Sequence, residues 1–142
     1  MDRLADLYQS VILEHYKNPR NVATLEHYNR HKRLDNPLCG DRVELFLQVD
    51  SETIAELSHK SRGCAICVAS ASMMTLCLQQ MEVAAALTLC GQLQSTVEAP
   101  VDSPWPALPE DLGVFVQARA YPSRVQCVTL AWRAATEALQ QE

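Results

Sequence analysis

The sequence lacks three features that would each assign a whole class of function. No apolar run approaches the roughly 18 residues that span a membrane, so we expect no membrane partner. The net charge is −5 and no long Lys/Arg block is present, which argues against nucleic-acid binding. The first residues alternate charged and apolar side chains, which is not the pattern of a signal peptide. We therefore expect a cytoplasmic protein.

One short basic cluster interrupts this acidic chain, at Arg30-His31-Lys32-Arg33. It lies within residues 19–38, which show no sustained hydrophobic period, so we predict a loop over this range. A charge cluster in a loop is usually solvated. The alternative is a docking patch for an acidic partner.

Six cysteines are present, and in a reducing compartment they indicate metal-binding or catalytic thiols before disulfides. A single CxxC motif joins Cys64 to Cys67, and no second one completes a four-cysteine zinc knuckle. The histidines show no ligand spacing with one another. Surface or loop positions are therefore predicted for all four, which are His15, His27, His31 and His59.

The length of 142 residues predicts one domain over residues 1–142. Apolar residues recur with helical spacing at Leu4, Leu7, Tyr8, Val11, Ile12 and His15, and Asn18-Pro19 ends this helix. Alternation predicts a strand over 43–49, followed by a turn at 50–52 and a weaker strand over 53–62. Strands grouped early and helices grouped late indicate an α+β fold, a small antiparallel sheet with helices on one face.

Helices are predicted for the rest of the chain, with one irregular crossover. The first begins just after Gly63, and a second covers 83 to about 93. Several prolines around Trp105 mark the crossover, and residues 112–118 form a short helix. The last helix covers 125–139, with predicted buried positions at Val125, Val128, Leu130, Ala131, Ala135 and Leu139.

Three fragments place a thiol beside a helix breaker or a charge: Cys39-Gly40-Asp41, Gly63-Cys64 and Arg124-x-x-Cys127. Three thiolates and a carboxylate fill a tetrahedral zinc shell, and they suit iron equally. Gly40 permits a backbone conformation that aims Cys39 and Asp41 at one point. The alternative is a plain turn with an Asp side-chain hydrogen bond.

The remaining thiols differ in their local setting. Cys64 at a helix start should have a lowered pKa, because the helix dipole favours thiolate; the alternative is a small buried residue. Arg124 lies one helical turn before Cys127 and is close enough to pair with a thiolate or a bound sulfur; the alternative is an exposed Arg beside a buried thiol. Cys67 shares an apolar stripe and is predicted to be core, although a CxxC redox pair is an alternative. Cys77 and Cys90 are predicted to be inert core thiols.

Three motifs in order carry a resemblance that covers nearly the whole chain. They are Leu7-Tyr8-x-x-Val11-Ile12-Leu13-x-His15-Tyr16-x-Asn18-Pro19-Arg20-Asn21, Asn36-Pro37-x-Cys39-Gly40-Asp41, and Gly63-Cys64-Ala65-Ile66 followed by Ala69-Ser70-Ala71-Ser72-Met73-Met74. In these the chain resembles the U-type iron–sulfur cluster assembly proteins, the family of IscU and the NifU N-terminal domain.

Within that family the chain is similar to SufU-like members. The 63 positions from Cys64 to Cys127 leave room for the proline-rich insertion of such chains, at about 96–112. Gln126 stands where IscU-like chains carry a His. Tyr121-Pro122-Ser123-Arg124-Val125 stands where they carry a Leu-Pro-Pro-Val-Lys chaperone signal, and Arg124 occupies the place of the SufU arginine.

The resemblance implies a SufE/NifU-like α+β fold with a metal site at one end. It also implies a zinc-dependent sulfurtransferase that accepts persulfide sulfur from a SufS-type cysteine desulfurase and passes it to downstream Suf cluster-assembly proteins. By this carry-over Cys39, Asp41, Cys64 and Cys127 hold zinc, and Cys39 accepts the sulfur near Arg124. Cys67 is a departure, since relatives tend to have serine there.

Three other functions are compatible with the same residues. A scaffold would assemble a [2Fe–2S] cluster, or bind iron, on the same ligands. A zinc adaptor would use the metal only to hold the fold. A CxxC oxidoreductase would depend on Cys67. Whether the chain is itself an enzyme is therefore open at this point.

Overall fold

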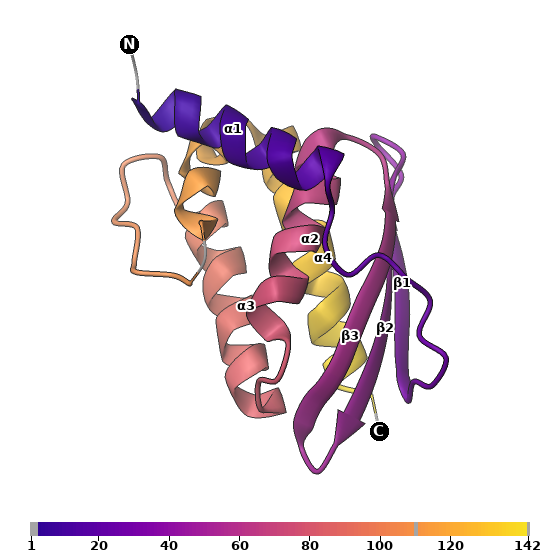
Figure 1. The fold of residues 1–142 in the computed structure, drawn as a ribbon. Coiled ribbons are helices and arrows are strands. Elements are labelled where there is room, and N and C mark those ends of the chain that lie inside the picture. The colour runs from indigo at the N-terminus through magenta and orange to yellow at the C-terminus, as the bar shows by residue number, and fades with distance from the viewer. Residues whose placement is uncertain (1–2, 110, 142) are drawn as a thin grey trace.

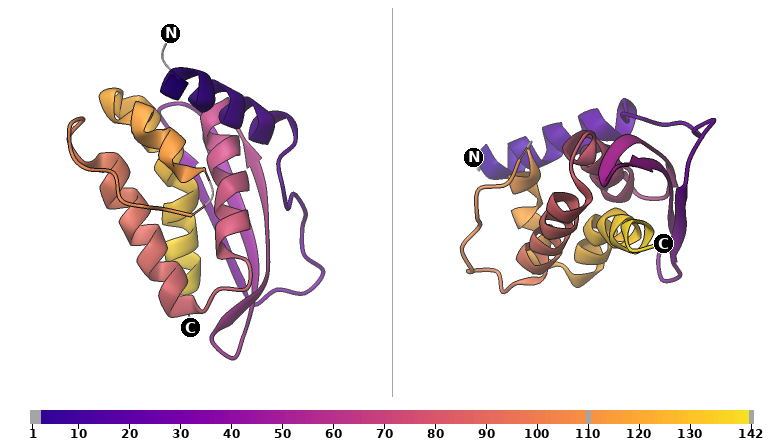
Figure 2. Two further views of the ribbon diagram at one scale, coloured as in Figure 1. Left: turned by 60° about the vertical axis from the view of Figure 1, so that its left-hand side comes forward. Right: turned by 90° about the horizontal axis from the view of Figure 1, so that it is seen from below.

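A three-stranded antiparallel sheet in the order β1-β2-β3 carries the helices on one side (Figure 1). This is the α+β architecture predicted from the sequence. The computed structural model describes residues 3–109 and 111–141, with side chains from residue 9 onward. Helices α2 and α4 pack directly on the sheet, and α1 and α3 pack on them in turn. Seen from below, α4 lies between α3 and the sheet (Figure 2).

The described elements follow the predicted order with one addition. They are α1 Arg3–Lys17, β1 Arg30–Asn36, β2 Asp41–Asp50, β3 Thr53–Arg62, α2 Ala65–Leu78, α3 Val83–Glu98, the 3-10 helix η1 Leu112–Ala120 and α4 Pro122–Leu139. The first helix ends before Asn18-Pro19 as predicted, but the side chains of Leu4, Leu7 and Tyr8 lie outside the described ones. None of the described helices has the length and apolar character needed to cross a membrane.

The predicted loop over residues 19–38 is wrong in its second half, because β1 occupies Arg30–Asn36. This strand lies at an edge of the sheet and alternates partly buried with exposed residues. Charged side chains with long aliphatic stems replace the apolar residues that would have revealed the strand. Lys32, for example, faces α4 and pairs with Glu137 at 3.3 Å between Nζ and Oε1. The basic cluster is therefore divided between two faces of a strand.

The first half of the same range packs against the sheet and helps to bury His59. His59 is 0% exposed, and its backbone N–H donates to Asn21 O at 2.9 Å. The His59 ring bonds Arg20 O through Nε2 at 2.9 Å and Ser61 Oγ through Nδ1 at 2.8 Å. The prediction of a surface position is wrong for His59, because these partners satisfy the hydrogen-bonding groups of the buried imidazole.

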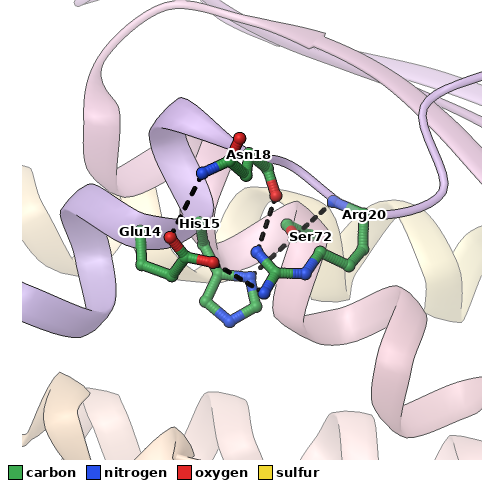
Figure 3. A network of polar contacts seen from close by, with 5 residues as sticks. All are labelled: Glu14, His15, Asn18, Arg20 and Ser72. Carbon is green, nitrogen blue, oxygen red and sulfur yellow. Dashed lines mark hydrogen bonds and ion pairs between the residues drawn. The ribbon is translucent and has the colours of Figure 1, made fainter.

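His15 is also buried, at 8% exposure, so the surface prediction is wrong for it as well. Its Nδ1 lies 2.8 Å from Ser72 Oγ on α2, and Ser72 Oγ also accepts the Arg20 backbone N–H at 2.8 Å (Figure 3). An ion pair of 2.8 Å joins Arg20 to Glu14. These contacts tie the end of α1 to α2. The predictions for His27 and His31 are confirmed, since both side chains are exposed.

Helix α2 is buried on nearly every side because it lies between the sheet and the outer helices. The predicted core position of Cys67 is confirmed, and so are those of Cys77 and Cys90. Ser70 is 0% exposed and donates to Val128 O at 2.6 Å, while it accepts the Trp132 Nε1–H at 3.0 Å. All six predicted core positions of α4 are buried.

The crossover between α3 and η1 is held by the buried side chain of Arg119. Its Nε donates to Thr96 O at 2.9 Å and its Nη1 to Ser103 O at 2.6 Å. The guanidinium also lies over the Trp105 ring, 4.9 Å from its centroid. Arg119 thus donates to backbone carbonyls of the proline-rich segment, which would pair with backbone N–H groups in a helix or a strand.

Candidate metal centre

The four predicted ligands meet at one end of the sheet, although they come from distant parts of the sequence. Cys39 lies in the β1–β2 turn, Asp41 begins β2, Cys64 precedes α2 and Cys127 lies in α4. The ligating atoms of Cys39, Asp41 and Cys127 lie within 4.8 Å of one another. Cys64 Sγ lies 3.6 Å from Asp41 Oδ2. The structure brings these four side chains together, and their binding of a metal stays a prediction.

Asn36 shapes the turn that presents Cys39. Its carbonyl accepts the backbone N–H of Cys39 at 3.3 Å and that of Gly40 at 2.9 Å. Its side-chain Oδ1 accepts the N–H of Leu38 at 3.1 Å. Gly40 has φ +72°, a left-handed conformation that glycine adopts without strain. The turn leaves Cys39 exposed at its tip and directs Asp41 inward.

Asp41 is the centre of the hydrogen bonding although it is only 1% exposed. Its Oδ1 accepts the Cys64 backbone N–H at 2.9 Å, and its Oδ2 accepts the Cys39 thiol at 3.1 Å. Burial opposes the charge of this carboxylate, but the donated hydrogen bonds outweigh it and lower the pKa of Asp41. The group therefore stays ionised. The carboxylate faces the thiols and also makes the side-chain hydrogen bonds of the plain-turn alternative, so metal binding by Asp41 stays a prediction.

Cys64 is the N-cap residue of α2, and its Sγ accepts the Cys67 backbone N–H at 3.4 Å. A hydrogen bond from Cys127 is the main cause that lowers the pKa of Cys64, to about 7, while burial opposes the shift. The pKa of Cys64 is lowered in the predicted direction, but its largest cause is the Cys127 thiol, and the N–H groups of Cys67 and Ile66 at the start of α2 contribute less. The hydrogen bond to Cys64 and burial raise the pKa of Cys127, which keeps its proton.

Cys39 and Cys67 are both protonated at neutral pH, for different reasons. Desolvation and the hydrogen bond to Asp41 raise the pKa of Cys39. Burial is the largest of the causes that raise the pKa of Cys67, which is 0% exposed. The Cys39 thiol is exposed at the turn, whereas the Cys67 thiol is buried and has no contact with solvent.

The donor types fit zinc, since the thiols of Cys39 and Cys127 lie close to each other and to the Asp41 carboxylate, and the Cys64 thiol lies beside the same carboxylate. In the metal-free cluster Asp41 is ionised and the pKa of Cys64 is lowered to about 7, while Cys39 and Cys127 hold protons. Binding of a divalent cation should release those protons, because thiolates are the ligating species. The same donors also suit iron.

The Arg124 side chain contacts Tyr121, a near neighbour in the chain. Helix α4 begins at Pro122, earlier than predicted, so Arg124 belongs to its first turn. The guanidinium lies over the Tyr121 ring, 4.4 Å from the centroid. Among the described residues, no hydrogen bond or ion pair joins it to the four-residue cluster. A role at the cluster stays a prediction and requires a change of rotamer.

Sequence reasoning missed the contribution of Asn36 to the site. Its signal was present, since Asn followed by Pro favours the start of a turn. The two hydrogen-bonding groups of Asn36 together hold the turn on which Cys39 sits.

Comparison with known proteins gives a consistent result over the whole chain. A family model described as NifU-like N terminal domain matches residues 7–141. The chain is 31% identical over 139 residues to the zinc-dependent sulfurtransferase SufU of Bacillus subtilis strain 168, with 98% of this chain and 93% of that protein covered. It is 30% identical over 140 residues to the iron–sulfur cluster assembly scaffold protein IscU of Streptococcus pyogenes serotype M1, with 99% and 87% covered.

A solved structure shares the fold at lower identity. The N-terminal part of a nitrogen-fixing NifU-like protein from Brucella abortus has a TM-score of 0.86 at 20% identity, with 98% of this chain and 96% of that chain covered. This likeness extends over the sheet and the helices alike, because it spans almost every residue of both chains.

Proposed function

The chain belongs to the NifU-like N-terminal domain family, and on that premise we propose that it is a zinc-dependent sulfurtransferase in iron–sulfur cluster assembly. It accepts persulfide sulfur from a cysteine desulfurase of the SufS type and passes it to the downstream Suf cluster-assembly proteins. The observation that carries this proposal is an exposed thiol, Cys39, at the tip of the β1–β2 turn and beside the buried Asp41 and Cys127. Cys64 is exposed as well, but it precedes α2 and does not stand on a turn. The similarity to a SufU named as a zinc-dependent sulfurtransferase supports it.

We assign zinc to Cys39, Asp41, Cys64 and Cys127. When bound, the ion supplies positive charge that keeps thiols deprotonated at neutral pH. That charge bears on Cys39, because burial and the hydrogen bond to the neighbouring Asp41 carboxylate raise the pKa of Cys39 in the metal-free cluster. Asp41 holds its place through the Cys64 N–H, so the carboxylate is positioned by backbone as well as by charge.

Sulfur transfer requires one bond to form and one to break. The Cys39 thiolate attacks the outer sulfur of the desulfurase persulfide, and a new S–S bond forms on Cys39. The bond between the two donor sulfurs breaks, and the donor cysteine leaves as a thiolate. The proton on the transferred sulfur stays there, so charge and electrons balance. We assign to Arg124 the role of stabilising the thiolate charge after it turns away from Tyr121.

A second candidate is a scaffold that assembles a [2Fe–2S] cluster on the same ligands. The similarity to the S. pyogenes protein named as an IscU scaffold favours this function. Thiolates suit iron as well as zinc. Gln126 in place of the IscU-type histidine supports the sulfurtransferase instead.

The deciding experiment measures alanine production by a SufS-type desulfurase, with and without the zinc-loaded chain. We expect stimulation by the native chain, loss with Cys39→Ala, and retention with Cys67→Ala as a matched control, because Cys67 is buried. Loss with Cys67→Ala would favour the CxxC oxidoreductase. A Cys39→Ala variant that only destabilises the fold would favour the zinc adaptor.

An absence of stimulation by the zinc-loaded chain would overturn the proposal. Anaerobic reconstitution with ferrous iron and sulfide would then test the scaffold. A [2Fe–2S] absorption spectrum that depends on Cys39, Cys64 and Cys127 would support that alternative.

A further inference from the structure

Leu38 is the most exposed of the described large apolar side chains, at 91% exposure. It directly precedes Cys39 at the tip of the β1–β2 turn. A leucine in that position loses the favourable free energy that burial in an apolar environment provides. Isolated exposed apolar residues are common on protein surfaces, so the exposure of Leu38 has meaning only through its place beside Cys39.

The turn holds Leu38 in this outward position. The Leu38 backbone N–H donates to Asn36 Oδ1 at 3.1 Å, and the Gly40 N–H donates to Asn36 O at 2.9 Å. These two bonds hold the backbone of residues 38–40 against Asn36. The backbone at Leu38 is therefore held in the turn, with the side chain exposed, before a partner arrives.

Sulfur transfer constrains what must contact the donor. An S–S bond is about 2.05 Å long, so the donor's outer sulfur has to reach Cys39 Sγ directly. The residues that flank Cys39 must then lie against the walls of the donor's active site. Gly40 has no side chain, so Leu38 is the only flanking side chain that can fill space there.

We propose that Leu38 is a docking residue that enters an apolar recess beside the persulfide of the cysteine desulfurase and so positions Cys39 for attack. This rests on the proposed sulfurtransferase function. The recess must be apolar, because a polar one would leave its own groups unpaired against a leucine. Leu38 contributes to binding of the desulfurase and takes no part in the chemical step of sulfur transfer.

The test is the dependence of desulfurase stimulation on the concentration of the zinc-loaded chain, for native protein, Leu38→Ser and Leu38→Met. We expect Leu38→Ser to raise the half-saturating concentration by about tenfold, with the same maximal stimulation. Leu38→Met should stay close to native, because its volume and apolar character are similar. The matched control is Val101→Ser, which changes a 63% exposed residue of the crossover between α3 and η1. That crossover lies on the far side of the helices from the sheet (Figures 1 and 2).

The possible outcomes distinguish the docking role of Leu38 from the sulfurtransferase function on which it rests. Native stimulation with an unchanged half-saturating concentration for Leu38→Ser would overturn the docking role and leave the sulfurtransferase intact. A lower maximum at an unchanged half-saturating concentration would also overturn it, because Leu38 would then act on transfer instead of binding. An equal effect of Val101→Ser would do the same. No stimulation by the native chain would overturn the function and the inference together.

Discussion

Gly63 and Asp41 pack so closely that no side chain fits between them. A Cβ atom on residue 63 would lie 2.8 Å from Asp41 Cα and 2.9 Å from Asp41 Cγ, closer than such atoms approach in proteins. Gly63 also has φ +131°, which side-chain-bearing residues rarely adopt. The carboxylate at the centre of the cluster thus occupies space that only glycine leaves free.

Gly63→Ala should therefore displace Asp41 and strain the backbone before α2. We expect a loss of roughly 2–4 kcal/mol in the free energy of unfolding, together with weaker zinc binding. The matched control is Gly91→Ala in α3, where a Cβ meets nothing within 4 Å. That change should stabilise the protein by about 0.5–1 kcal/mol, because alanine is the better helix former. Urea unfolding of both variants measures the difference, and equal effects would contradict the close packing of Gly63 and Asp41.

Asp41→Ala should lower zinc affinity at least about 100-fold, since even the outer partners of metal ligands contribute 10- to 100-fold. The change removes a ligand and also the acceptor of the Cys64 N–H. Competition with a chromophoric chelator measures the affinity. Asp35→Ala is the control, because Asp35 is an exposed carboxylate that pairs with Arg42 at 2.6 Å. Unchanged zinc affinity and sulfur acceptance in Asp41→Ala would exclude this residue from the site.

The thiols of the metal-free protein should react with iodoacetamide in a defined order. The pKa of Cys64 is lowered to about 7, chiefly by the hydrogen bond from Cys127, so its alkylation rate should reach half of its plateau near pH 7. The pKa of Cys39 is raised, so its rate should still increase through pH 9. Buried Cys90, whose pKa is raised to about 12, should stay unmodified. Peptide mass spectrometry resolves the sites, and faster labelling of Cys39 at pH 7 would refute the order.

His59 should make stability fall in mild acid. Burial lowers the pKa of His59 in the folded state below its ordinary value of 6.5. Between these two pKa values the unfolded chain binds more protons, so stability is complete above pH 6.5 and decreases as the pH falls, by at most about 1.4 kcal/mol per pH unit. His59→Gln should flatten this dependence in urea unfolding at several pH values. The exposed His27, replaced by Asn, is the control; a flattening of equal size there would contradict the assignment to His59.

Two buried histidines show where local patterns were insufficient. Histidine is a polar side chain, and contacts such as those of His15 with Ser72 and of His59 with Arg20 O make its burial tolerable. These partners lie 57 and 39 positions away along the chain. A short window of sequence cannot contain both members of such a pair, so the prediction defaulted to the surface.

The sequence did not predict strand β1, for a related reason. Its residues Arg30 and Lys32 are partly buried at the edge of the sheet, where aliphatic stems cover the core and the charges reach Glu137 or solvent. The β2 strand was predictable because Val43, Leu45 and Leu47 alternate on a fully buried face, whereas the signal for β3 was weaker. A charged edge strand is distinguished from a loop only once its neighbour is known.

Helical and strand periods, the turn at Asn36-Pro37 and the three thiol-bearing fragments were determined by the sequence itself, because they depend on neighbours within a few positions. Gly40 was visible there too, as a residue that permits unusual backbone, and Gly63 as the residue before a helix. Only the tertiary structure decided that Asp41 receives the Cys64 N–H, that Arg124 lies on Tyr121 and that Leu38 stands outside the core. These depend on how β2, α2 and α4 pack at one end of the sheet, and that packing is set by the burial of the whole core rather than by any one segment.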